Sequence, residues 1–121
     1  MFNISRNGII TVNRGDSFSL DVFVNLGTEL EPIPYLMEQG DVLYFALMEP
    51  NQPFECALIR QAYTSESMNE EGVVSMNFPG EWTEFILPGN YYYQIKLVRP
   101  QEGANDLIDT IVPKTKITIL D

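Results

Sequence analysis

An alternating run near the C-terminus, residues 91–98, constrains the fold of this chain more than any other stretch. Its odd positions are all aromatic or aliphatic, whereas its even positions include a glutamine and a lysine. Side chains of a β-strand point alternately to the two sides, so this pattern predicts a strand with one buried face. Pro88, Gly89 and Asn90 precede it, and these residue types favour a tight turn. We therefore expect a turn followed by a strand.

The same pattern, a short apolar run followed by turn residues, recurs along the 121 residues, and no convincing amphipathic helix interrupts it. This spacing predicts an all-β fold of seven or eight strands, an immunoglobulin-like antiparallel β-sandwich forming one domain over residues 1–121. A barrel is the alternative, because periodicity does not say whether the sheets close. Cys56 is the single cysteine, so we expect no disulfide. The expected strands are 8–13, 16–25, 42–48, 54–63, 73–78, 91–98, 108–112 and 115–119.

The inward faces of these strands predict the hydrophobic core. We expect the core to include Phe18, Leu20, Val22, Tyr91, Tyr93, Ile95, Ile117 and Ile119.

Three further segments depart from simple alternation. Residues 42–48 are almost wholly apolar, which predicts a central strand or one with partners on both faces. Residues 26–40 contain Gly27, Pro32 and Pro34 and read as a long crossing loop, with one helical turn at residues 35–38. Pro113 predicts a bulge or a change of sheet, because proline lacks the donor that a central ladder needs.

Charge and composition exclude several classes of partner. The chain has 17 acidic and 7 basic residues, a net charge of −10, and would repel nucleic acid and anionic membrane surfaces. It contains no histidine, which removes the commonest general base and transition-metal ligand. No stretch approaches the roughly 20 apolar residues of a membrane span. We expect no cofactor, no metal, no catalytic residue and no enzymatic activity.

Two short motifs have a functional and a structural interpretation. Arg14-Gly15-Asp16 matches an integrin-binding tripeptide, but Gly15 and Asp16 are also typical turn residues that would open the next strand, and we favour the turn. The acidic cluster at Glu66, Glu70 and Glu71 lacks the alternating oxygen ligands and the central glycine of a calcium loop. We expect a solvated loop there.

Aromatic side chains are the most informative surface feature of the sequence. Alternation places five of them on outward faces or at strand ends, and aromatic residues are enriched where proteins meet proteins. They can also stack on sugar rings, and loops or a second sheet can cover them. The candidate interaction surface consists of Phe23, Tyr44, Trp82, Phe85 and Tyr92.

Three motifs follow one another in a recognisable order: Arg14-Gly15-Asp16-Ser17, then Leu87 to Ile95, then Asp109-Thr110-Ile111 with Lys116-Ile117-Thr118-Ile119. Together they resemble the immunoglobulin-like N-terminal domain of tailed-phage baseplate upper proteins. Tyr91 and Tyr93 match the two tyrosines of that family's Gly-x-Tyr-x-Tyr strand, and Ser17 stands where threonine is usual. Family members often continue into coiled or receptor-binding regions, whereas this sequence ends at Asp121, directly after the last expected strand. The resemblance therefore implies a stand-alone module.

The resemblance implies a structural or interaction protein of a phage virion, in the baseplate, tail or head, assembled in the host cytoplasm. Its partners would be other virion proteins or further copies of itself. The alternative is a carbohydrate-binding or adhesive immunoglobulin-like module that uses Trp82 and outward tyrosines as stacking platforms.

Overall fold

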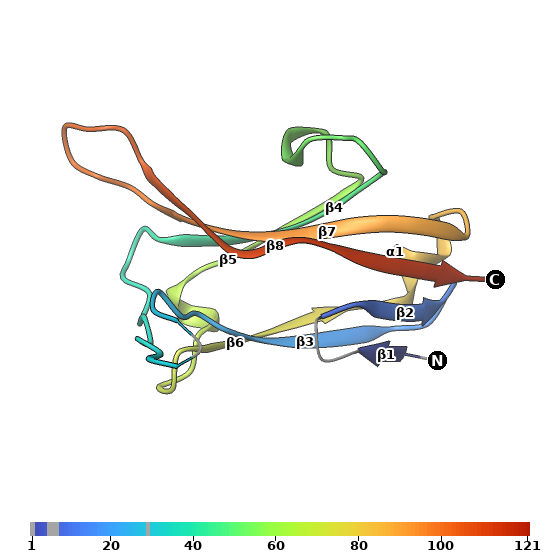
Figure 1. The fold of residues 1–121 in the computed structure, drawn as a ribbon, viewed down its shortest axis with the longest axis horizontal. Coiled ribbons are helices and arrows are strands. Elements are labelled where there is room, and N and C mark those ends of the chain that lie inside the picture. The colour runs from blue at the N-terminus through green and yellow to red at the C-terminus, as the bar shows by residue number, and fades with distance from the viewer. Residues whose placement is uncertain (1, 5–7, 29) are drawn as a thin grey trace.

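The computed structural model describes residues 2–4, 8–28 and 30–121, with residues 2–4 described by their backbone alone. The described residues form a six-stranded sheet of order β1-β2-β8-β7-β4-β5 and a two-stranded sheet, β3-β6. Figure 1 shows β4, β5, β7 and β8 as one layer and β3 with β6 as the other. The strands are β1 (Phe2–Ile4), β2 (Ile10–Asn13), β3 (Phe18–Phe23), β4 (Val42–Met48), β5 (Ile59–Tyr63), β6 (Val73–Phe78), β7 (Gly89–Arg99) and β8 (Leu107–Leu120).

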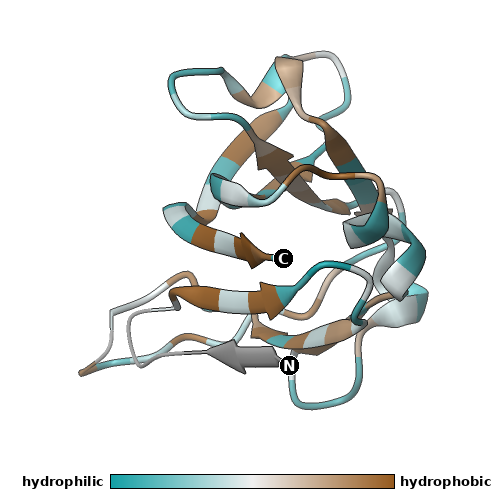
Figure 2. Ribbon diagram, turned by 90° about the vertical axis from the view of Figure 1, so that its right-hand side faces the viewer, coloured by the Kyte–Doolittle hydropathy of each residue, from teal (hydrophilic) through white to brown (hydrophobic). Residues whose placement is uncertain are grey.

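Helix is almost absent from the described residues, so the all-β prediction is confirmed and the arrangement is sandwich-like. The helical elements are α1 (Gly80–Glu84) and the 3₁₀ turns η1 (Phe54–Cys56) and η2 (Ser65–Ser67). The hydropathy colouring of Figure 2 shows brown apolar segments mainly along strands and teal polar segments mainly in loops.

The core lies between the two sheets, and alternation predicted it correctly. All eight residues expected there are buried. Phe45 occupies the centre: its ring lies 4.5 Å from that of Phe78 and 5.7 Å from that of Tyr93. Phe18 stacks on the other side of this group, 4.5 Å from Phe78. Aromatic pairs at such separations add to the stabilisation that comes from burial alone.

The apolar run of β4 has the central position that the sequence predicted, because β4 pairs with both β5 and β7. Four successive residues at its end, Phe45 to Met48, are buried. Two of them face the core, whereas Ala46 and Met48 form a small second cluster with Phe54 on the outer face of the sheet. The connection between β4 and β5 therefore folds back over the sheet and covers this end of the strand.

The antiparallel expectation fails at one pair of strands. β2 pairs in parallel with β8, which makes the larger sheet mixed. The strand that follows β2, β3, belongs to the other sheet, so β2 does not form a hairpin with it. β2 pairs instead with β8, at the far end of the sequence. The backbone N–H of Arg14 extends this contact by donating to the carbonyl of Leu120 at 2.6 Å.

The two irregular segments differ from each other in outcome. β8 runs continuously through Pro113, and its register with β7 shifts between Tyr93 and Lys96, so the prediction of a bulge is confirmed and a change of sheet does not occur. The helical turn expected at residues 35–38 does not form. The carboxylate of buried Asp41 accepts hydrogen bonds there from the Tyr35 hydroxyl (2.5 Å) and the Glu38 backbone N–H (2.9 Å). These bonds hold the segment in a loop.

Candidate interaction surface

The short helix α1, between β6 and β7, is held in place by one buried threonine. The Thr83 hydroxyl accepts a hydrogen bond from the backbone N–H of Gly15 at 2.9 Å and lies 3.0 Å from the carbonyl oxygen of Asp16. The Arg14 guanidinium donates to the carbonyl of Glu84 at 2.8 Å. The Arg-Gly-Asp segment is thus a turn bound to α1, and Gly15 has the positive φ of 86° that favours glycine.

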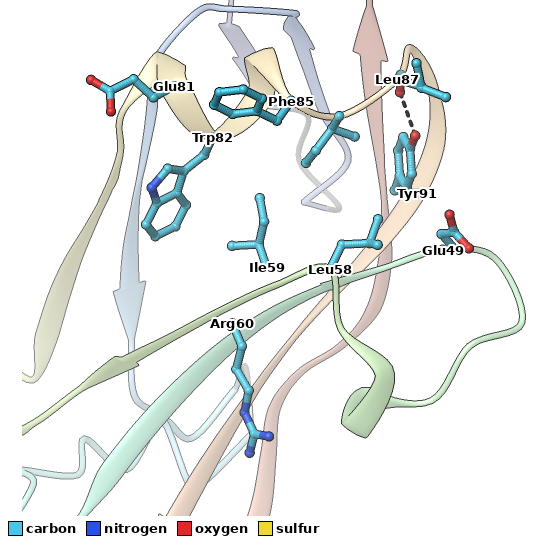
Figure 3. Close-up of a pocket in the computed structure, with 10 residues that line it drawn as sticks. Glu49, Leu58, Ile59, Arg60, Glu81, Trp82, Phe85, Leu87 and Tyr91 are labelled. Carbon is cyan, nitrogen blue, oxygen red and sulfur yellow. Dashed lines mark hydrogen bonds between the residues drawn. The ribbon is translucent and has the colours of Figure 1, made fainter.

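Helix α1 forms one side of a pocket of about 700 Å³, and the start of β5 forms the opposite side. In Figure 3, Trp82 and Ile59 point into the space between these elements, with Phe85 above them. The Arg60 side chain points away from this space, and Glu81 and Glu49 lie at its two ends. The pocket therefore has apolar walls, carboxylates at both ends and no cationic head group inside.

Large apolar side chains around this pocket are exposed to an unusual degree. The exposed fraction is 86% for Phe85, 71% for Leu87 and 49% for Leu58. An isolated exposed apolar residue is ordinary, but several around one hollow are typical of a binding surface. We name the group Leu58, Ile59, Trp82, Phe85 and Leu87 the α1 patch.

Trp82 is less exposed than the sequence suggested. It is half-buried and packs edge-on against Phe78, with 5.3 Å between ring centroids, because α1 turns it back toward the core. One part of the ring is thereby fixed while another lines the pocket.

The structure brings Trp82 and Phe85 together but separates the other predicted aromatics. Tyr44 and Tyr92 lie on the outer face of the six-stranded sheet, and Phe23 lies on the outer face of β3. Tyr44 is only partly exposed, because Phe54 packs edge-on against it at 6.5 Å. The β4–β5 connection, which contains Phe54, covers this residue. Alternation predicts which face of a sheet a side chain lies on, but not whether another segment covers that face.

Sequence reasoning missed the aliphatic members of the α1 patch. A signal was present, since Trp82, Phe85 and Ile86 have the i, i+3, i+4 spacing of one helical turn. No local signal connects this turn with Leu58, which comes from the β4–β5 connection, 24 residues before Trp82 in the sequence.

The second predicted turn lies beside the same patch. Pro88 is in a bend, whereas Gly89 and Asn90 already belong to β7. The Tyr91 hydroxyl donates a hydrogen bond of 2.6 Å to the carbonyl of Leu87 and so closes the segment between α1 and β7.

The acidic cluster at residues 66–71 is organised by an asparagine. The Asn69 side-chain oxygen accepts hydrogen bonds from the backbone N–H groups of Glu71 (2.9 Å) and Val73 (3.0 Å). In the described part of the chain, no three His, Cys, Asp or Glu side chains form a group suited to a metal ion. Nor is any helix there long and apolar enough to cross a membrane.

The polar groups of Tyr35, Tyr93 and Arg99 have shifted pKa values, make hydrogen bonds within the fold and lie away from the pocket. Burial, then the hydrogen bond to Asp41, raises the pKa of Tyr35 to about 12. Burial also raises the pKa of Tyr93, whose hydroxyl donates to the carbonyl of Gly8 at 2.5 Å. The Arg99 guanidinium forms an ion pair of 2.6 Å with Asp109, and this hydrogen bond raises the pKa of Arg99. None of these residues lines the pocket beside α1.

Comparison with known proteins adds no identification. No family model matches the chain, and no curated protein matches it significantly in sequence.

Proposed function

We propose that this chain is a non-enzymatic interaction module of a tailed-phage particle that docks on other virion subunits through the α1 patch. The observation that carries the proposal is the gathering of exposed Phe85, Leu87 and Leu58 around one pocket. Exposed apolar groups around a hollow are stabilised when a partner removes them from water. The module would be assembled into the virion in the host cytoplasm.

We propose further that the sandwich is a variant of the immunoglobulin-like fold. β3 and β6 would correspond to strands B and E, and β4, β7 and β8 to strands C, F and G, with β5 added beside strand C. The Tyr91–Leu87 hydrogen bond supports this assignment, since such domains carry a tyrosine near the start of strand F that bonds to backbone just upstream. β2 would have left strand B's sheet to pair with strand G.

The chemistry around the pocket favours binding over catalysis. Apart from Arg60, whose side chain points away from the space, its ionisable groups are Glu49 and Glu81 at opposite ends and Tyr91, whose hydroxyl already bonds to Leu87. A nucleophile needs a base within hydrogen-bonding reach, and a chain without histidine lacks the usual one. We therefore propose a docking surface and no active site.

Mass spectrometry of purified phage particles tests the proposal. We expect the chain at a fixed copy number in particles that have packaged DNA. Its absence from intact, DNA-filled particles would contradict the virion assignment. Reproducible turnover in broad hydrolase screens, retained after repurification, would contradict the non-enzymatic assignment.

Carbohydrate binding is the second candidate, and the position of Trp82 favours it specifically. The indole lines the pocket between two carboxylates, and aromatic rings with nearby hydrogen-bond acceptors can hold a sugar. Glycan-array binding that is lost in Trp82→Phe would favour this candidate, because phenylalanine keeps the packing on Phe78 but presents a smaller ring. An array without signal would leave protein docking as the account of this patch.

A further inference from the structure

The cations of this acidic chain are segregated in the sequence. Residues 15–59 and 61–95 contain no lysine or arginine, although they hold most of the carboxylates. β3, β6 and all of the connections next to β6 fall within these two ranges. The smaller sheet and the connections on either side of β6 therefore carry acidic residues and no lysine or arginine of their own, although Arg14, from the turn before β3, contacts α1.

Four of the seven cations come together on the outer face of the larger sheet. The Arg60 guanidinium and the Lys96 ammonium each lie 5.0 Å from the centroid of the Phe54 ring. Lys114 donates to the carbonyl of Gln52 in the same connection at 2.7 Å. Lys116 pairs across the strands with Tyr92. We name Arg60, Lys96, Lys114 and Lys116, with Tyr92, the basic face.

These cations lack the partners that an acidic chain offers in excess. Among the described residues, none of the four forms an ion pair with a carboxylate. The connection that crosses the basic face adds just two acids, Glu49 and Glu55, so the cations outnumber them by four to two. The rest of the molecule carries 15 acids and three cations. The fold thus places four cations on one face and most carboxylates elsewhere, although the chain has enough carboxylates to pair with every cation.

The opposite outer face, that of β3 and β6, combines acids with an exposed aromatic ring. Asp21 projects from β3 beside Ser75, whose hydroxyl donates to its carboxylate at 2.8 Å. Phe23 is 41% exposed, and the Gly72 position lies against its ring. Glu71 immediately precedes that glycine. We name Asp21 and Phe23 of β3, together with Glu70 and Glu71 of the turn that leads into β6, the acidic face.

We propose that the basic face binds the acidic face of a second copy of this chain. Each face presents an exposed aromatic ring, Tyr92 on one and Phe23 on the other, surrounded by charges of opposite sign. At physiological ionic strength the Debye length is about 8 Å, so charges at the contact outweigh the net repulsion of distant ones. Complementary faces of this kind set both the partner and the register of association.

Protein carboxylates fit this face better than nucleic-acid phosphates do. Four cations on a chain of net charge −10 cannot offset the repulsion of a polyanion by the remaining acidic surface. The contact joins two different faces on opposite sides of the sandwich, so it is heterologous and leads to a ring or an open stack. It does not involve the α1 patch, and its failure would leave the proposed docking function unaffected.

Two complementary variants test this proposal by sedimentation velocity. Lys96→Glu/Lys116→Glu disables the basic face, and Asp21→Lys/Glu71→Lys disables the acidic face. At about 0.15 M salt we expect the wild-type chain to self-associate in the micromolar to millimolar range and each variant to associate at least about tenfold more weakly. An equimolar mixture of the two variants keeps one wild-type contact and pairs the two altered faces with their charges reversed, so the mixture should associate more strongly than either variant alone.

Controls separate the contact from general charge effects and from misfolding. Glu102→Lys/Asp106→Lys makes the same charge change as the acidic-face variant at the exposed tip of the β7–β8 hairpin, and should associate like wild type. Phe85→Asp should also associate like wild type. Circular dichroism verifies that each variant is folded. A wild-type chain that stays monomeric at about 1 mM, or a variant mixture that associates no more strongly than either variant alone, would overturn the proposal. So would binding of duplex DNA that Lys96→Glu/Lys116→Glu abolishes.

Discussion

The hydroxyl of Tyr91 donates a 2.6 Å hydrogen bond to the backbone carbonyl of Leu87, four residues earlier in the chain. The bond joins the beginning of strand β7 to the segment that leaves α1. It therefore fixes the rim of the pocket on which Leu87 and Phe85 are exposed. A residue chosen from the sequence as a core tyrosine also organises the surface beside it.

Removing this bond should destabilise the fold by a small, measurable amount. We expect Tyr91→Phe to lower the free energy of unfolding by about 1 kcal/mol, the usual net contribution of one partly buried hydrogen bond. Urea denaturation measures the change. Tyr92→Phe is the matched control, because its ring lies on the outer face and should have almost no effect. Equal losses in the two variants would contradict the role assigned to Tyr91.

The seating of α1 should be sensitive to a single methyl group. A Cβ atom at Gly80 would lie 2.2 Å from the backbone oxygen of Gly15, so the helix or the turn must move. We expect Gly80→Ala to cost about 2 kcal/mol or more in unfolding free energy, as overpacking does. Glu81→Ala changes the next, exposed position and should stay within about 0.5 kcal/mol of wild type. If Gly80→Ala left the free energy of unfolding unchanged, α1 would not be held against the Arg-Gly-Asp turn.

Tyr35 should make stability depend on pH in the alkaline range. Burial, and then the hydrogen bond to Asp41, raises its pKa in the folded state from 10.0 to about 12. A raised pKa favours the neutral phenol in the folded state, so its contribution is complete below pH 10 and is lost between about pH 10 and 12. The stability advantage of wild type over Tyr35→Phe should shrink across that window in urea titrations. Parallel pH profiles for the two proteins would refute this assignment.

The sequence predicted those parts of the fold that depend on local alternation. The buried faces of β3 and β7 and the central position of β4 follow from which side chains alternate or fail to. Alternation says nothing about which strands pair, so the parallel contact of β2 with β8, about a hundred residues apart, was out of reach.

The candidate surface was predicted less completely, for a related reason. An outward position on a strand is exposed unless another segment covers it, and Phe54 covers Tyr44. Phe85 and Tyr92 are exposed as alternation suggested, but the pocket next to Phe85 needs Leu58 from a distant connection. The helical spacing from Trp82 to Ile86 was visible in the sequence, but five residues are too few for periodicity to identify a helix. Periodicity also does not show which distant residues such a helix contacts.

Quantitative mass spectrometry of intact particles tests docking through the α1 patch most directly. Particles would be assembled with wild-type chain, with Phe85→Asp, or with Leu30→Asp, which places the same charge on a residue that is 94% exposed and remote from the pocket. We expect wild type and Leu30→Asp at equal copy number and Phe85→Asp reduced about tenfold or more, as when a charge enters an apolar contact. Incorporation of Phe85→Asp at the wild-type copy number would contradict the account.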